Sequence, residues 1–435
     1  MRLTLPLHLG RGVLLLLLTT SPLYAASLHH ELTGLVERNP QTATAMAELE
    51  SLQSQARVTL GQWYPELDLT LTGGGQDNHN SEGMVETADA NLRLSQLLWN
   101  FGATNLEIEK MARQLEEKRL NLQRVRQQLL VDGASAWINV VRAYRTLQYA
   151  IQSEENIQRQ TGLEEVRVAG GMGYSTDLLQ SQSQLAGASS RRMQAESGYM
   201  QASNRYRELF GYPPEQVEQW SYPPADPLTA PLPESLESLL KLALVQNIEL
   251  QLAKLSDEIA AKNRDQTRAN TLFPELKLIL ESNHKFNSTG IRHQNKDESI
   301  AKLELKYRFN LGLSGFDTLD VAIADERAQR QRTLTQTRAI ERGVRDGWLQ
   351  LQTATNRTEV LQQQSEISAG FLELARRERE LGNRSLLDVL SGETALITAR
   401  SDAESAYADT LLAAIVLLQQ LGQLELHHFD FVSSQ

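Results

Sequence analysis

Cysteine is absent from all 435 residues of the chain. Disulfide bonds, thiolate metal sites and a lipid-modified N-terminal cysteine are therefore excluded. Basic residues are in the minority, with 43 Lys and Arg against 54 Asp and Glu, so a nucleic-acid-binding surface is not expected. Proline is also scarce, with 12 residues, many of them between Pro213 and Pro233. The rest of the chain is therefore free to form long helices and strands.

Long hydrophobic runs are confined to the N-terminus, where Arg2 and Arg11 precede an apolar run over 12–18. Small residues around Ala25 follow, and this order is typical of a secretory signal peptide. We predict a signal peptide over 1–25, with cleavage after Ala25. No later stretch of about 20 apolar residues occurs, so we expect the mature chain to have no membrane-spanning helix and to enter a membrane only as β-strands.

Catalytic and metal-binding patterns are also missing. Residues 171–173, Gly-Met-Gly, lack the third glycine of a dinucleotide-binding loop and follow a helical pattern rather than a strand. His79, His284 and His293 fall in two polar loops without a framework of carboxylates or cysteines. We interpret them as exposed loop residues and not as metal ligands. No enzymatic activity, cofactor or metal is expected.

Two stretches of the chain begin alike, Tyr64-Pro65-Glu66-Leu67 and Phe273-Pro274-Glu275-Leu276. In each, a proline ends a helical pattern, and an alternation of polar and apolar residues then predicts a β-strand with one apolar face. The two prolines are 209 residues apart, and four further pairs are 211 apart: Trp137 and Trp348, Gly171 and Gly382, Asp177 and Asp388, Gly211 and Gly422. This offset indicates one structural unit that is repeated in the chain.

Each unit is predicted to be a helix, a β-hairpin, a long helix and a return helix. The first unit is expected to have a helix over 28–62, two strands around a polar loop over 73–87, a long helix over 103–169 and a return helix over 175–209. The second is expected to have a helix over 235–270, two strands around a polar loop over 282–299, a long helix after Gly315 and a return helix ending at Leu421. The resulting division is a signal peptide (1–25), a first repeat (26–211), a proline-rich connector (212–234) that packs Trp220 on the helices, a second repeat (235–422) and a C-terminal tail (423–435).

The long helix of the first unit carries apolar residues every seven positions, at Leu115, Leu122, Leu129 and Ala136. A helix of about 65 residues measures on the order of 100 Å. A helix of that length with a seven-residue apolar repeat needs neighbouring helices along its side, as in a coiled coil. The fold is therefore expected to be mainly α-helical.

The predicted strands alternate between apolar and polar or charged residues. The apolar positions that we expect to face lipid are Leu67, Leu69, Leu92, Leu94, Leu303 and Leu305. This pattern suits a transmembrane β-barrel, and the alternative is a pair of soluble hairpins that pack on their own helices. Four strands cannot close a barrel, because the smallest single-chain barrels have about eight. Two copies would supply eight strands and three would supply twelve, and the pattern alone leaves both possible.

The order of these elements resembles the TolC-like family of outer-membrane export channels. The resemblance covers nearly all of the mature chain and includes the two strand starts, Glu37-Arg38-Asn39-Pro40 in the first helix, and the turn Leu381-Gly382-Asn383-Arg384-Ser385-Leu386-Leu387-Asp388-Val389-Leu390. It implies a homotrimer with a shared twelve-stranded barrel in the bacterial outer membrane and an α-helical tunnel across the periplasm. The implied partners are outer-membrane lipid, a periplasmic adaptor protein, and an inner-membrane ABC exporter or proton-driven pump.

The resemblance also implies a gate at the periplasmic end of the tunnel. By position, Arg384 matches the family's gating arginine, Thr176 its threonine partner, Asp177 the gating aspartate and Asp388 an inward-facing acidic ring. Arg379 stands where the family has a tyrosine, so Asp177 is expected to pair with a charge. The resemblance therefore implies two gate contacts, Arg384 with Thr176 and Arg379 with Asp177.

Two observations limit this assignment. Ser391 stands where a second ring aspartate would be, so only one acidic ring is expected. Asp177 and Asp388 also have an ordinary interpretation, because an aspartate near a helix start is often a cap or a first-turn charge.

Three functions follow from these patterns. We expect an exit channel in a tripartite export system, and the missing lipid-anchor cysteine favours type I protein secretion. The outer-membrane component of a multidrug efflux pump is the alternative. A periplasmic coiled-coil adaptor would explain the long helices, but the alternating hairpins argue against it.

Overall fold

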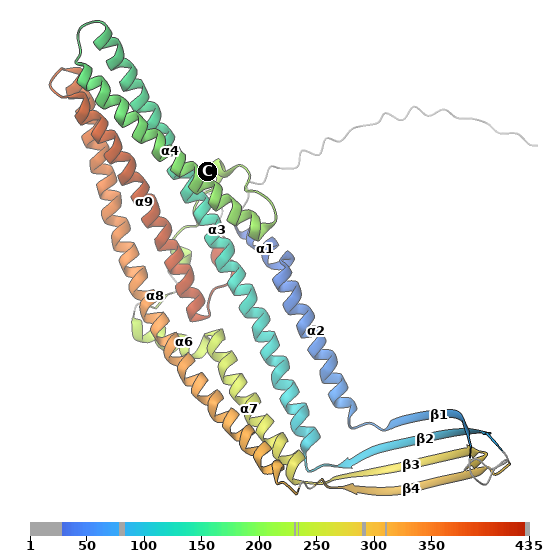
Figure 1. Cartoon of the computed structure of the whole chain (residues 1–435). Coiled ribbons are helices and arrows are strands. Elements are labelled where there is room, and N and C mark those ends of the chain that lie inside the picture. Colours follow the sequence, from blue (N-terminus) through green and yellow to red (C-terminus); the bar gives the residue numbers. More distant parts are fainter. Residues whose placement is uncertain are drawn as a thin grey trace, which may run out of the picture.

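The computed structural model describes residues 28–77, 83–229, 232–233, 235–288, 293–308 and 311–430. The expected signal peptide and His79 lie outside these ranges. Figure 1 shows a layer of long helices with one β-sheet at its end. The helices are α1 (Leu28–Arg38), α2 (Pro40–Gly61), α3 (Ala103–Ala169), α4 (Ser175–Phe210), α5 (Asp226–Thr229), α6 (Leu236–Gln246), α7 (Ile248–Leu272), α8 (Ser314–Glu380) and α9 (Leu386–Leu421). The strands are β1 (Glu66–Gln76), β2 (Val85–Trp99), β3 (Glu275–Phe286) and β4 (Lys296–Lys306).

The predicted duplication is confirmed by the order and the length of the elements. The long helices α3 and α8 each have 67 residues, and the return helices α4 and α9 each have 36. Gly211 and Gly422 cap the two return helices with φ of 86° and 75°, in the left-handed region that favours glycine. The chain is therefore mainly helical, with one small sheet to which both repeats contribute.

The first helix of each repeat is broken, so the single helices predicted over 28–62 and 235–270 are wrong. Asn39 has an extended backbone, and its side chain accepts a hydrogen bond from the Gln41 N–H at 2.9 Å. Pro40 occupies the first helical position, where a missing N–H has no cost. In the second repeat Asn247 caps α7 by accepting from the Leu250 N–H at 2.9 Å. An asparagine that could cap a new helix was the signal at both breaks.

The four strands form one antiparallel sheet in the order β1-β2-β3-β4. Both polar loops are shorter than the predicted spans of 73–87 and 282–299. Gly73, Gly74 and Gly75 belong to β1 and lie opposite Ala88, Thr87 and Glu86 of β2. Backbone pairing with a neighbouring strand is available to glycine as to any residue, and here it outweighs the low strand propensity of glycine.

The strand register groups the predicted apolar residues on one face. Leu67 lies opposite Leu94, and Leu94 lies opposite Leu280 on the next strand. Further along, Leu278 is paired with Leu303. Directly opposite residues in antiparallel strands point to the same face, so one apolar face runs across all four strands.

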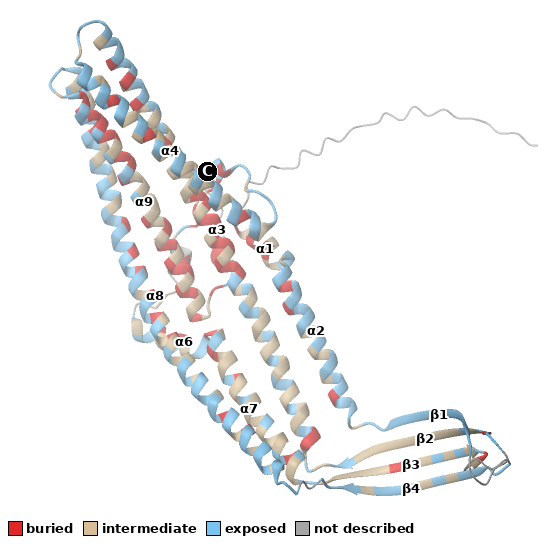
Figure 2. Ribbon diagram, viewed as in Figure 1, coloured by how far each residue is buried: buried red, intermediate tan, exposed pale blue. Residues whose placement is uncertain are grey.

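The main core lies where the two repeats meet, about halfway along the helices. Trp137 of α3 stacks on Trp220 of the connector with ring centroids 3.7 Å apart, and its Nε1–H donates to the Ser221 carbonyl at 3.0 Å. The prediction that Trp220 packs on the helices is thus confirmed. Residues Leu426–Phe429 of the tail form a 3₁₀ turn, and Phe429 is fully buried. Figure 2 shows the buried residues concentrated on α3 and α9 in this part of the molecule.

The helices form a layer whose order changes along its length (Figure 1). In the half farther from the sheet, which we call the tip half, the order is α4, α3, α9, α8. In the half nearer the sheet it is α2, α3, α7, α8. Thus α8 forms one edge along the whole layer, and α2 and α4 share the other edge. Within the described ranges, no helix combines the length and the apolar character needed to cross a membrane.

Candidate functional site

The candidate site is the tip, where the turns α3–α4 and α8–α9 lie. Gly171 and Gly382 both adopt positive φ, of 75° and 80°. In each turn the next residue donates its N–H five residues back, from Met172 to Arg167 at 2.8 Å and from Asn383 to Glu378 at 2.9 Å. Glycine at this left-handed position ends both helices in the same way, so the two repeats present matching turns.

The two predicted aspartates lie in the first turns of the return helices. Asp177 is in the first turn of α4 and Asp388 in the first turn of α9, and both are exposed. The backbone N–H of Asp388 donates to the Ser385 hydroxyl at 3.2 Å. Negative charge at a helix N-terminus is favourable, so the ordinary interpretation applies to both. Among the residues described, neither carboxylate has an ion-pair partner.

Arg384 and Thr176 do not meet in one copy of the chain. The Nε of Arg384 is 3.0 Å from Glu378, and its guanidinium lies over the Phe371 ring, 5.2 Å from the centroid. Thr176 is exposed at the start of α4. Arg384 is therefore held by its own repeat, next to the turn that carries it.

Arg379 pairs with a residue that the sequence analysis did not identify. Its guanidinium is 3.1 Å from the carboxylate of Glu164 on α3, and it also donates to the Arg384 carbonyl at 3.3 Å. The Glu164 side chain is only 5% exposed. Within one copy, the expected contact of Arg379 with Asp177 is thus replaced by a buried ion pair between the two repeats.

A signal for Glu164 was present in the sequence. The seven-residue repeat of α3, continued beyond Leu129 and Ala136, passes through Ala150 and Ile157 to Glu164, and all five residues are buried. A charged residue at a core position of such a repeat needs a partner, because an unpaired buried charge is costly. The partner is Arg379, which the pattern of α3 alone could not reveal.

Further polar contacts join the two repeats between the tip and the core. They lie between α3 and α9, and residue numbers fall on one helix as they rise on the other, as expected for antiparallel neighbours. The pairs are Asn156 with Glu393 (2.6 Å), Tyr149 under the guanidinium of Arg400 (5.8 Å to the ring centroid), Arg145 with Glu404 (2.8 Å) and Arg142 with Asp409 (3.2 Å). Glu393 also accepts from Arg376 of α8 at 2.6 Å.

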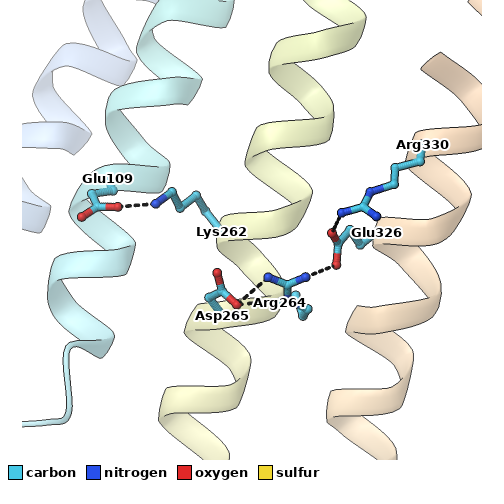
Figure 3. A network of polar contacts seen from close by, with 6 residues as sticks. All are labelled: Glu109, Lys262, Arg264, Asp265, Glu326 and Arg330. Atoms are coloured by element: carbon cyan, nitrogen blue, oxygen red, sulfur yellow. Dashed lines mark hydrogen bonds and ion pairs between the residues drawn. The ribbon is translucent and has the colours of Figure 1, made fainter. Parts of the chain in front are cut away.

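A separate polar network lies in the half nearer the sheet (Figure 3). Glu326 of α8 is 4% exposed and lies between Arg264 of α7, at 2.6 Å, and Arg330. Arg264 also pairs with Asp265 at 2.7 Å. This network holds α7 against α8 within the second repeat, so we assign it a structural role.

The six predicted lipid-facing leucines lie on the apolar face of the sheet. Leu67 and Leu69 are each 64% exposed, and Leu303 and Leu305 are each 67% exposed. Leu92 and Leu94 lie opposite Leu69 and Leu67 on the neighbouring strand. An exposed apolar surface of this regularity needs a covering that one copy does not supply.

The other face of the sheet carries charges. Glu281 of β3 lies 3.4 Å from Arg93 of β2 and 3.9 Å from Lys302 of β4. The two faces therefore differ as the alternating pattern predicted.

The loop histidines form no metal site in the described part of the chain. His284 pairs with Asp297 across β3 and β4, and the N–H of His293 donates to the Asn287 side chain at 2.7 Å. Among the described residues, no group of three or more His, Asp or Glu residues is arranged to hold a metal ion.

The comparisons with known proteins agree with this geometry. The family described as "Outer membrane efflux protein" matches residues 33–212 and 239–423, one match for each repeat. The outer membrane protein TolC of Vibrio cholerae is 23% identical over 415 residues, which cover 93% of this chain and 92% of TolC. TolC of Escherichia coli is 22% identical over 412 residues, which cover 89% and 80%. The crystal structure of the Campylobacter jejuni CmeC outer membrane channel superimposes with a TM-score of 0.79 at 12% identity, covering 91% of this chain and 85% of that one.

Proposed function

The chain belongs to the outer membrane efflux protein family, and from this premise we propose that it is the exit channel of a tripartite system for protein secretion. It is an outer-membrane channel protein, a conduit and not an enzyme. The observation that carries the proposal is the combination of a sheet with one apolar face and a layer of helices that extends away from it. In the proposed system, an inner-membrane exporter and a periplasmic adaptor deliver the substrate to the tip.

We propose that three copies assemble. The sheet supports assembly because β1 and β4 are edge strands, each paired on one side only. An exposed strand edge is a template for pairing with another chain. If β1 of one copy pairs with β4 of the next, the sheets close without a free edge, and three copies give twelve strands, within the known range of membrane barrels.

The helical edges support the same assembly. On α4 the exposed apolar residues recur every seven positions, at Leu179, Ala186, Met193 and Met200. On α8 they do so at Val360, Ile367, Leu374 and Leu381. We call these the α4 stripe and the α8 stripe. Two different surfaces on opposite edges of one copy fit a head-to-tail ring, because each edge can cover the other edge of its neighbour.

The apolar face of the sheet is proposed to contact lipid. Leu303→Arg places a charge on that face and should reduce the yield of outer-membrane trimers, since a lipid-facing arginine near the midplane costs about 2–4 kcal/mol. Glu304→Arg, on the opposite face, is the matched control and should be tolerated. Equal trimer yields from both variants, measured in outer-membrane fractions, would contradict the proposed orientation.

The tip is proposed to be the closed mouth of the channel. Asp177 and Asp388 are exposed and available to neighbouring copies, and Arg384 and Thr176 lie on the same two turns. In a ring, three copies of each aspartate would repel unless opposite charges hold them. We therefore expect the double variant Arg384→Ser with Asp177→Ala to raise single-channel conductance several-fold. Conductance equal to that of the parent would remove these residues from the gate.

Protein secretion is proposed as the transport function on the basis of the cysteine-free sequence, which excludes a lipid anchor. The test is deletion of the gene in the source organism, with measurement of secreted protein and of drug susceptibility in the same strain. Loss of a secreted protein with unchanged susceptibility is the expected result. Raised susceptibility with normal secretion would instead support multidrug efflux, the alternative that the family's description favours.

A further inference from the structure

The contact between α3 and α9, which we call the inter-repeat seam, changes its character along its length. Toward the sheet it is apolar, and its residues belong to the main buried core: Val131, Ala134 and Ile138 from α3, with Leu411, Ile415 and Leu418 from α9. Toward the tip it consists of the polar pairs described above, beginning with Arg142 and Asp409. The change occurs within one helical turn of Val141 and Ala408, which are still buried in the core.

The two parts of the seam respond differently to separation. Moving the apolar part apart would expose hydrocarbon to water, which is unfavourable in proportion to the area exposed. The polar pairs are partly wet already, since the Arg142 and Asp409 side chains are 32% and 45% exposed. Charged groups of this kind exchange a protein partner for water with little net change. The polar part is therefore the part of the seam that can open.

The last contact toward the tip is different, because it is buried. Glu164 pairs with Arg379, whose side chain is 23% exposed. The turn covers this carboxylate closely: a Cβ on Gly173 would lie 3.0 Å from its Oε1. Separation of the repeats leaves Glu164 without its partner until water reaches it. This pair is therefore the main resistance to opening along the polar part of the seam.

We propose that the two repeats of one copy separate at the tip when the channel opens, pivoting on the core near Val141 and Ala408, and that the Glu164–Arg379 pair sets the resistance to this movement. The proposal rests on the channel function proposed above and assigns a gating role to Glu164. The helix pair α8 and α9 then moves away from α3 and α4, and the polar pairs break in order from the tip toward the pivot.

The test is single-channel conductance of purified trimers in planar bilayers. Glu164→Gln keeps the shape of the side chain and removes its charge, so it should raise conductance several-fold. Glu165→Gln changes the exposed neighbouring residue in the same way and should conduct like the parent. Asp409→Asn, at the polar pair nearest the pivot, should have a smaller effect than Glu164→Gln.

A charge exchange separates the ion pair from general damage at the tip. Glu164→Arg with Arg379→Glu should return conductance toward the parent value, whereas either change alone should raise it. Glu164→Gln trimers that are intact on a gel but conduct like the parent would overturn the inference and leave the channel function standing. Failure of the parent itself to form channels would overturn the proposed function and this inference with it.

Discussion

The return helices α4 and α9 occupy the same place in the two repeats and have the same length, yet their surroundings are opposite. Of the 36 residues in each, 18 are buried in α9 and only three in α4. The reason is position, since α9 lies between α3 and α8 while α4 lies at the edge of the layer. A repeated sequence therefore specifies the same helix twice, but neighbouring elements decide how much of it is covered.

The exposed residues of α4 show what the edge position requires. The α4 stripe keeps the seven-residue spacing of a packed helix although nothing in one copy covers it. Regular apolar spacing on a surface indicates a missing partner helix, whereas scattered exposed apolar residues would need no explanation. The difference between α4 and α9 thus becomes an argument about assembly.

The largest effect is expected from a cavity in α9. Leu418 is fully buried, and Leu418→Ala should lower the free energy of unfolding by about 2–5 kcal/mol, as for other buried leucines. The matched change on α4 is Leu179→Ala, at a side chain that is 67% exposed in one copy. Denaturant unfolding followed by circular dichroism should show the loss only for Leu418→Ala. Equal losses would mean that α4 is buried as deeply as α9 within a single copy.

A smaller effect is expected when a charge is placed in the α4 stripe. Met193→Glu should shift the equilibrium from trimer to monomer, because burying an unpaired polar group costs about 1–3 kcal/mol or more. Gln194→Glu adds the same charge to the neighbouring exposed position, off the stripe, and should leave the trimer intact. Light scattering of the detergent-solubilised protein distinguishes the two. Trimers from Met193→Glu as stable as those from Gln194→Glu would show that the stripe is not an interface.

The smallest effect concerns the glycines that end the two helices. A Cβ at Gly422 would lie 2.2 Å from the Gln246 carbonyl oxygen, whereas a Cβ at Gly211 would meet no atom within 4 Å. Both positions have left-handed φ, so alanine costs about 1–2 kcal/mol of backbone strain at either one. Gly422→Ala should therefore lower the melting temperature more than Gly211→Ala. Equal shifts would mean that the Gln246 backbone moves away without cost.

Much of the helical framework could be predicted from the sequence. The bounds of α3 follow from a proline-free stretch that keeps its seven-residue spacing and ends at Gly170. The breaks at Asn39 and Asn247 were missed because the surrounding residues are good helix formers. There the capping side chains and, at Asn247, a contact with the end of α9 outweigh local propensity: the Asn247 amide donates to the Gln420 carbonyl at 2.6 Å.

The tip was predicted less completely. The positions of Asp177 and Asp388 in the first helical turns follow from the turns themselves. The partner of Arg379 does not, because it lies 215 residues away on another helix. Only Glu164 gave a warning, as a charged residue at a core position, and the identity of its partner depends on how the two repeats pack.

The most direct test of assembly through the helical edges uses the absence of cysteine. Met193 lies 18 residues from the start of α4 and Val360 lies 20 residues from the end of α8, so both are at nearly the same height above the tip. Within one copy they are on opposite edges of the layer. The double variant Met193→Cys with Val360→Cys should form disulfide-linked dimers and trimers on mild oxidation, while each single variant should not. A double variant that stays monomeric on a denaturing gel after oxidation, although its trimers are intact, would contradict the account.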